Sequence, residues 1–460
     1  MRIEYSPLDR DKQEIRLLEL LPRNNDRKQK LFPTCRIFHA CLPAGPRFTA
    51  LSYVWRDVKK EQVILVGESP VLVTKNLYEA MIALQPVNEP LFIWIDALCI
   101  NQADDDEKSW QVGLMQEIYR QAHQVLAWLG IAEKESDSVI DNLHCLGGKA
   151  ELLTREIMSP WEYTSQKLCL VLGSLIRGDV PTAEMMKPLR SSRPLTREDY
   201  MPLFGFIDAY YEQKGLKMIG ALKDFITRPW WGRIWVLQEI ALPENAQFVC
   251  GTKTISRDRC AAAIRTYRMW WMSLAEKATA GDLITLKERP HQLEAFSNLP
   301  LHRPTVMLSV REVYMDNQFM LAALLRATCV GSHNLRLHGS HHMEATDPRD
   351  KIYALLCLAP DREELKNKGI IPNYSGSCTY QDLYSSVMVV LIQVGYISLL
   401  SLCQHAGTCT GLPSWVPHWS SSITHMLQDV RDDHVTIHPT FSASGKSLDY
   451  PEVSAIRKVA

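Results

Sequence analysis

The sequence has almost no net charge, and this excludes one class of partner. Its 51 Lys and Arg residues nearly cancel its 52 Asp and Glu residues, which leaves a formal net charge of -1. Proteins that bind nucleic acid normally carry an excess of basic residues, because these neutralise the phosphates. We therefore expect no nucleic-acid partner.

The sequence also has no segment typical of export or membrane insertion. The first twenty residues mix both charge signs and lack the apolar stretch of a signal peptide. The most apolar run, residues 387–402, is shorter than the roughly 20 residues that span a bilayer, and Gln393 and Gly395 interrupt it. Twelve cysteines scattered over 460 residues are typical of a reducing compartment. We expect no membrane span and a cytoplasmic location.

The common fingerprints of catalysis and cofactor binding are missing as well. The sequence contains no phosphate-binding glycine loop, dinucleotide glycine triplet, His-Glu-x-x-His motif or nucleophile elbow. Two groups of Cys and His, at residues 35–41 and 403–409, lack the paired spacing of a structural zinc site. We therefore expect no metal and no certain cofactor.

What the sequence does contain is an ordinary globular composition, with 46% hydrophobic and 22% charged residues. Up to residue 255, short apolar strands alternate with amphipathic helices, a pattern that predicts an α/β fold with a parallel sheet. Helical patterns then dominate to residue 460. We expect two domains, residues 1–255 and 256–460, and a polar insertion at about residues 177–200 in the first.

The most informative stretch is residues 91–130, which predicts a strand, a loop, a helix and a second strand. The polar residues after its first strand are Asp96, Cys99, Asn101, Gln102 and Glu107. Ligands of open α/β sheets bind beyond the carboxyl ends of the strands, so these side chains would converge on one crevice. The alternative is a structural loop, since caps and turns use the same residue types.

A second signature, TRPWWGRIWVLQEIAL at residues 227–242, predicts one helix capped by Thr227. Its three tryptophans are typical of a core helix. Arg228, Gln238 and Glu239 are harder to place in a core, because a buried charge or amide needs a partner. We expect at least one of these three to meet the loop at residues 96–107.

Three motifs, in this order, resemble the fungal heterokaryon-incompatibility (HET) domain over about residues 48–239. They are LSYVW (51–55), the long segment at 94–130 and RPWWGRIWVLQE (228–239). Three later pieces resemble the helical region that commonly follows: TDPRDKIYALLCLAP (346–360), IIPNYS (370–375) and LPSWVPHW (412–419). The resemblance implies a flavodoxin-like parallel sheet core, remotely similar to Toll-receptor-type (TIR) domains, followed by a mostly α-helical C-terminal region.

Three positions depart from the family pattern. Arg56 stands where the motif usually has glycine, and Asn373 and His418 stand where it has aspartate. A bulky cation at residue 56 replaces a residue that allows close backbone approach. These departures, together with an early end after residue 448, leave open a member that keeps the fold and has lost its output.

The resemblance implies self/non-self recognition at hyphal fusion and signalling of programmed cell death in the cytoplasm of a filamentous fungus. The HET domain would then bind a protein partner or assemble with itself, and a small-molecule ligand is a further expectation. The residues expected to bind are Tyr53, Trp55, Asn101, Gln102, Gln111, Arg228, Trp235, Gln238 and Glu239.

The alternative is an enzyme with Glu107, Asp96 and Cys99 as catalytic residues. In one form, Glu107 would contact the ribose of NAD as substrate, as in TIR-like NAD hydrolases, while Trp55 or Trp235 stacks on a base. In the other form, the HET scaffold would serve secondary metabolism, with these residues as acid or base in an isomerisation or cyclisation.

Overall fold

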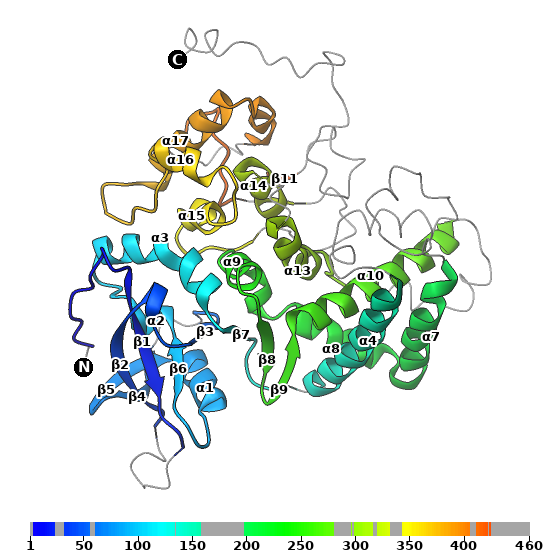
Figure 1. The fold of residues 1–460 in the computed structure, drawn as a ribbon. Coiled ribbons are helices and arrows are strands. Elements are labelled where there is room, and N and C mark those ends of the chain that lie inside the picture. Colours follow the sequence, from blue (N-terminus) through cyan, green and yellow to red (C-terminus); the bar gives the residue numbers. More distant parts are fainter. Residues whose placement is uncertain are drawn as a thin grey trace. The chain divides into compact units, whose positions relative to one another are not determined.

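The protein is described here by a computed structural model in which two compact units form (Figure 1). The structure describes residues 3–23, 32–55, 60–133, 135–157, 197–279, 296, 299–315, 320–331, 343–404, 411–421 and 423–424. Unit 1 comprises residues 1–102, 114–232 and 239–315. Unit 2 comprises residues 103–113, 233–238 and 316–460. The predicted boundary at residue 255 stays a prediction.

Within its described residues, unit 1 contains a nine-stranded sheet in the order β5-β4-β2-β1-β6-β3-β7-β8-β9. The strands are β1 (Glu14–Leu20), β2 (Thr34–Cys41), β3 (Thr49–Ser52), β4 (Lys60–Val66), β5 (Ser69–Thr74), β6 (Leu91–Trp94), β7 (Gln124–Trp128), β8 (Ala246–Cys250) and β9 (Lys253–Ser256). The strands predicted from apolar runs are thus present, including the pair that begins and ends the 91–130 stretch.

Four neighbouring strands form the parallel core of this sheet. Strands β6, β3, β7 and β8 lie side by side and run parallel. In chain order they stand 2-1-3-4, which is the order of the first four strands of a flavodoxin-like sheet. The α/β class and the parallel core are therefore confirmed.

The sheet is nevertheless mixed, not wholly parallel. Strand β1 pairs antiparallel with both β2 and β6, and the hairpins β4-β5 and β8-β9 close the two edges. Hairpins this tight allow only antiparallel pairing, because a parallel partner needs a long crossover. The core extends over both faces of the central strands, where Trp94, Ile95 and Ala127 are fully buried.

Helices follow the strands of unit 1 as the periodicity predicts. Their bounds are α1 (Lys75–Leu84), α2 (Asp96–Cys99), α3 (Asp105–Gln121), α4 (Ser136–Ile157), α7 (Arg197–Lys214), α8 (Leu216–Ile226), α9 (Val236–Ala241), α10 (Arg257–Thr279) and α13 (His302–Met315), of which α3 and α9 also contribute residues to unit 2. Helix α1 begins after Thr74, whose hydroxyl accepts the Leu77 N–H at 3.3 Å. Residues 177–196 of the predicted insertion lie outside the described residues.

Helices α4 and α10 pack closely because of one glycine. A Cβ atom on Gly147 would overlap the Arg259 carbonyl oxygen and lie 2.8 Å from Arg259 Cγ. The same arginine forms an ion pair with Glu151 at 2.8 Å. Contact between the two helices therefore requires glycine at residue 147, while Gly148 has its nearest neighbour, Arg259 Cζ, at 3.7 Å.

The prediction of one helix over residues 227–242 is wrong. Thr227 ends α8, since its N–H bonds to the Lys223 carbonyl, and a 3₁₀ turn, η2 (Pro229–Gly232), precedes α9. The Ile234 N–H donates to the Glu344 carbonyl at 2.9 Å. A bond to a residue more than a hundred positions away thus replaces the bond that would continue a helix.

Unit 2 is mainly helical in its described residues, which confirms the helical C-terminal region. It contains α14 (Leu321–Cys329), β10 (Val330–Gly331), α15 (Asp350–Leu356), α16 (Arg362–Asn367), α17 (Tyr380–Gln393), η3 (Ile397–Leu402) and β11 (Ile423–Thr424). Thr379 begins α17 with a capping box shared with Asp382. Residues 387–402 thus form the end of α17 and the turn η3.

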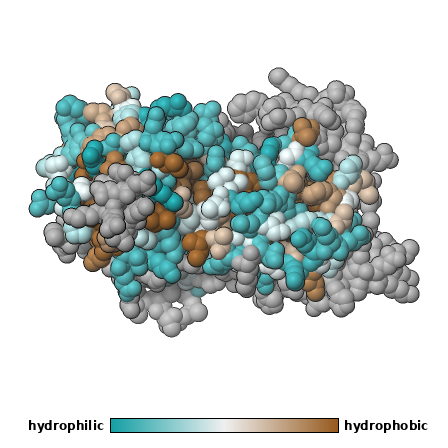
Figure 2. Space-filling view, turned by 90° about the horizontal axis from the view of Figure 1, so that it is seen from below, coloured by the Kyte–Doolittle hydropathy of each residue, from teal (hydrophilic) through white to brown (hydrophobic). Residues whose placement is uncertain are grey.

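Among the described residues, none of the helices has both the length and the hydropathy needed to cross a bilayer. On the face shown in Figure 2, hydrophilic residues surround several separate groups of hydrophobic ones. Single exposed apolar side chains such as Leu72 and Leu216 are ordinary features of protein surfaces.

Candidate functional site

The switch point of the parallel core lies between β3 and β7, where ligands of flavodoxin-like sheets bind. In unit 1 a buried hydrogen-bond network lies at the carboxyl end of β3. The Ser52 hydroxyl donates to the Glu239 carboxylate, and the Trp230 indole donates to Ser52 Oγ at 2.8 Å. All three residues are about 1% exposed. The second signature therefore closes the end of β3, and Glu239 meets Ser52.

Arg228 makes similar hydrogen bonds just after the carboxyl end of β7. Its Nη1 donates to the carbonyls of Leu129 and Ile131, at 2.9 and 3.0 Å. Between them, Gly130 has φ +110°, and a Cβ there would lie 3.1 Å from the guanidinium. The glycine is required both for its backbone conformation and for the approach of Arg228.

A more accessible pair lies at the carboxyl end of β6. The Trp55 indole, in a residue that is 46% exposed, donates to both carboxylate oxygens of Asp96 at 3.0 and 3.1 Å. Asp96 also accepts the Ala97 N–H at 2.7 Å, and its carbonyl accepts from the Gln102 amide at 3.1 Å. The structure thus brings together three of the predicted residues. Two other predicted positions nearby differ in burial, since Tyr53 is in the core and Asn101 is half-buried.

Cys99, by contrast, is fully enclosed in the core of unit 1. Its sulfur accepts the Ile95 N–H at 3.4 Å, and its carbonyl accepts from Arg16 at 3.1 Å. Burial raises the pKa of the Cys99 thiol. A nucleophilic cysteine needs a lowered pKa and solvent access, so this environment is that of a structural thiol.

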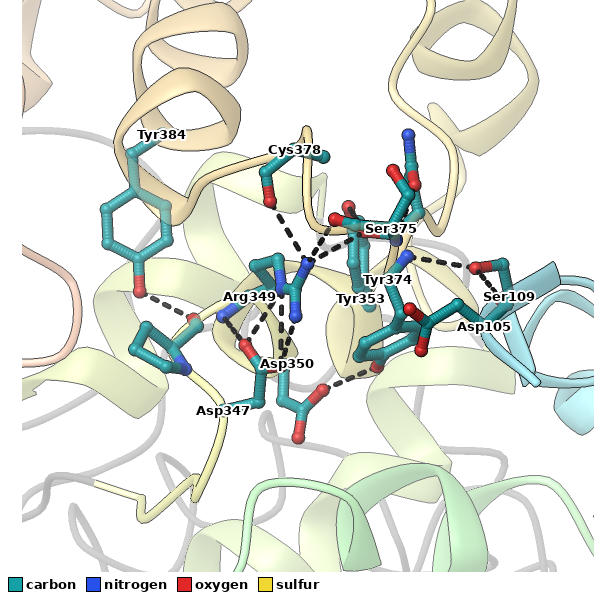
Figure 3. Close-up of polar contacts among 12 residues, drawn as sticks. Asp105, Ser109, Asp347, Arg349, Asp350, Tyr353, Tyr374, Ser375, Cys378 and Tyr384 are labelled. Carbon is teal, nitrogen blue, oxygen red and sulfur yellow. Dashed lines mark hydrogen bonds and ion pairs between the residues drawn. The ribbon is translucent and has the colours of Figure 1, made fainter. Parts of the chain in front are cut away.

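A polar cluster in unit 2 centres on Arg349 (Figure 3). Its Nε and Nη2 form a two-pronged ion pair with Asp347, with the shortest distance 2.7 Å. Its Nη1 points to three carbonyls, of Asn373, Ser375 and Cys378, at 3.4, 3.3 and 3.0 Å. Burial raises the pKa of Asp347, but hydrogen bonds and charge from Arg349 outweigh it and hold that pKa below its ordinary value.

Asp350 and Tyr374 form the second part of this cluster. The Tyr374 hydroxyl donates to Asp350 Oδ1 at 2.5 Å, and the Trp235 side chain also bonds to this carboxylate. Burial raises the pKa of both Asp350 and Tyr374. The Tyr374 ring also lies 5.5 Å from the Tyr353 ring, edge to face.

Two residues of α3 complete the cluster. The Tyr374 N–H donates to Ser109 Oγ at 2.9 Å, while the Lys108 ammonium lies 4.2 Å from the centroid of the Tyr374 ring. Of the other predicted residues in unit 2, Glu107 is half-buried with its N–H bonded to Asp104, and Gln111 and Gln238 are fully buried. None of the described residues form a group of three or more His, Cys, Asp or Glu suited to a metal ion.

Sequence reasoning missed the roles of Asp347, Arg349, Asp350 and Tyr374. The family-like pieces at 346–360 and 370–375 were the available signal, since they contain all four of these residues. Of the departures, Asn373 Oδ1 accepts the Ser375 N–H at 2.9 Å, and the His418 ring packs edge to face on Tyr380 at 5.8 Å. Arg56 lies outside the described residues.

Comparison with known proteins shows what this chain is similar to. Residues 48–239 match the family model described as heterokaryon incompatibility protein (HET). The chain therefore contains a HET domain, as its three motifs predict. Heterokaryon incompatibility protein 6, OR allele, of Neurospora crassa is 29% identical over 427 residues, which are 86% of this chain and 56% of that relative. The chain thus spans little more than half the length of this relative. No solved structure matches the chain.

Proposed function

We propose that this protein acts in heterokaryon incompatibility, recognising a non-self partner after hyphal fusion and signalling cell death through its HET domain. The observation that supports this most is the extent of the likeness. The similarity to a protein named for incompatibility covers 86% of the chain, well beyond the HET match at residues 48–239. The likeness therefore includes most of unit 2 as well as the HET domain.

The geometry of unit 1 agrees with a signalling module. The residues of the second signature that approach the ends of β3 and β7 contact the domain itself. The contact of Trp230 with Ser52 is buried, and that of Arg228 with the Leu129 carbonyl is partly buried. Their chemistry is thus used to hold the fold. A partner would bind the outer surface of the domain, either as another protein or as a second copy of this chain.

Expression of the intact chain in a filamentous fungal host tests the proposal. We expect growth arrest and loss of viability when the protein meets an incompatible partner allele. Trp230→Ala, which removes a buried indole, should abolish the response, whereas Lys253→Ala on an exposed ion pair should not. Normal growth in every combination would contradict the proposal.

A second candidate function is an enzyme, in the form of an NAD hydrolase. It is favoured by the pair of Trp55 and Asp96, because a half-exposed indole beside a carboxylate at the ends of parallel strands suits a stacked base and a polar contact. Recruitment of the same pair to acid-base chemistry on a fungal metabolite is the related alternative.

Release of nicotinamide from NAD by the purified protein tests the enzymatic candidate. Asp96→Asn and Glu107→Gln should each abolish release without changing the unfolding transition. Asp106→Asn removes an exposed carboxylate next to Glu107 and should leave the rate unchanged. Absence of release by the wild-type chain, both dilute and concentrated enough to assemble, would reject this function. A small molecule that copurifies with the chain would favour the metabolite alternative.

A further inference from the structure

Unit 2 includes two short segments that belong to the HET match. Residues 103–113 and 233–238 lie within residues 48–239, yet they form one compact unit with residues 316–460. We propose that the C-terminal region restrains the HET domain by holding these two segments, and that Tyr374 and Asp350 form the latch. This inference rests on the proposed signalling function and concerns its regulation.

The first segment is held through the beginning of α3. Ser109 Oγ accepts the Tyr374 N–H at 2.9 Å, while the same hydroxyl donates to the Asp105 carbonyl at 2.6 Å. Lys108 lies 4.2 Å from the centroid of the Tyr374 ring, within the range of a cation–π interaction. One residue of the C-terminal region therefore binds two consecutive residues of α3, as Figure 3 shows for Ser109.

The second segment is held through its backbone and one indole. The Ile234 N–H donates to the Glu344 carbonyl at 2.9 Å, and Arg233 pairs with Glu344 in a parallel bridge. One residue further on, a side-chain hydrogen bond from Trp235 lowers the pKa of the Asp350 carboxyl, against the larger effect of burial. This attachment also interrupts the helix that the sequence of residues 227–242 would otherwise form.

The two attachments meet at one hydrogen bond. Tyr374 contacts the first segment and Asp350 the second, and the Tyr374 hydroxyl joins them at 2.5 Å. Asp350 directly follows Arg349, whose Nη1 bonds to the carbonyls of Asn373 and Ser375 on either side of Tyr374. The ion pair of Asp347 and Arg349 thus fixes the positions of both latch residues.

The chemistry of these contacts suits a latch that opens. When the latch opens, its hydrogen bonds are replaced by bonds to water, so each contributes only a modest net free energy. Lys108 and Ser109 are also only half-buried. Regulated conformational equilibria in proteins require small free-energy differences that a partner is able to overcome. Both held segments continue directly into unit 1, at residues 114 and 239. Release of a segment would therefore change the backbone conformation where the chain enters unit 1.

Hydrogen exchange of the full chain tests the latch itself. Ser109→Ala should speed exchange of residues 105–113, and Trp235→Phe should speed exchange of residues 233–238. Each change should be about tenfold, the effect of losing one hydrogen bond on a local opening equilibrium. Ser401→Ala removes a hydroxyl that bonds only locally to Ser398 in the contacts of unit 2 described here, and it serves as the matched control. Unchanged exchange in both segments would overturn the latch.

The fungal growth assay then tests the restraint. We expect the double variant Ser109→Ala/Trp235→Phe to cause cell death without a partner, while the wild-type chain requires one. Faster exchange with an output that still depends on the partner would overturn the restraint. If the wild-type chain causes no death with any partner, the proposed function fails, and the exchange measurement still decides whether the two segments are latched.

Discussion

Replacement of Arg349 should destabilise unit 2 in a graded way. The guanidinium serves two groups of acceptors at once, Asp347 on one side and three backbone carbonyls on the other. Both side chains are largely removed from solvent, with exposed fractions of 17% for Arg349 and 26% for Asp347. Arg349→Lys keeps the charge but has one compact ammonium, which reaches only one of the two groups.

The size of each effect follows from the contacts that are lost. Two carbonyl contacts, at 3.3 and 3.4 Å, are long, so the bond to Cys378 at 3.0 Å dominates that side. A bond to a charged group contributes about 1.5–3 kcal/mol, and this is the expected cost of Arg349→Lys. Arg349→Met also leaves Asp347 without its cation, so its cost should be about 3–5 kcal/mol.

Urea unfolding followed by far-UV circular dichroism, together with hydrogen exchange of residues 343–378, measures these changes. The exchange data are needed because a chain with two units need not unfold in one step. Asp347→Asn added to Arg349→Met should recover part of the loss, since it removes the unpaired carboxylate. Arg326→Lys, on an exposed contact with Ser398, should change stability by less than about 0.5 kcal/mol.

The reasoning would be refuted if Arg349→Lys lowered the free energy of unfolding by less than about 0.5 kcal/mol. It would also be refuted if Arg349→Lys cost more stability than Arg349→Met.

The pH dependence of stability provides a second check. The folded pKa of Asp347 is lowered, despite the opposing effect of burial, so its contribution is present above the ordinary carboxyl pKa and is lost as pH falls through the lower folded pKa. In Arg349→Met this loss of stability in acid should disappear.

Three further predictions concern stability. Gly147→Ala should cost about 2 kcal/mol or more in thermal unfolding, because its Cβ would overlap Arg259, whereas Gly148→Ala should not; equal effects would contradict the packing of α4 on α10. Asp350→Asn should become more stable relative to wild type as pH rises, since burial raises the folded pKa of Asp350 and its ionisation disfavours folding. A stability difference between variant and wild type that stays constant with pH would contradict this. Thr379→Ala should cost about 1 kcal/mol in urea unfolding, because the α17 cap is lost. An unchanged free energy of unfolding would show that the capping box does not stabilise the protein.

The features predicted correctly from the sequence are those determined over short stretches. Apolar runs located β6 and β7, because the side-chain period of a strand is a local property. The antiparallel neighbours of β1 were not predicted, since β1 pairs with β6 across more than seventy residues. The prediction of one helix over residues 227–242 was wrong for the same reason, because the hydrogen bond that interrupts it comes from the distant residue Glu344.

The candidate sites divide along the same line. Trp55 and Asp96 come from two signature segments that each follow a strand. Both were proposed as site residues, but the hydrogen bond between them was not predicted. Ser109 and Tyr374 lie 265 residues apart, and no spacing or periodicity in one sequence relates them. Each also has an ordinary local interpretation, Ser109 as a polar residue of an amphipathic helix and Tyr374 as part of a turn.

The departure at Asn373 shows how the structure changes the meaning of a motif difference. Asn373 Oδ1 accepts the Ser375 N–H at 2.9 Å, a turn contact that an aspartate makes equally well. The Asn373 carbonyl, which is independent of the side chain, accepts from Arg349 and from the Tyr353 hydroxyl. Asparagine therefore preserves the contacts described at this position, and it brings one negative charge fewer than an aspartate would. The difference from the family pattern leaves the cluster intact, so at residue 373 it is no sign of a degenerate protein.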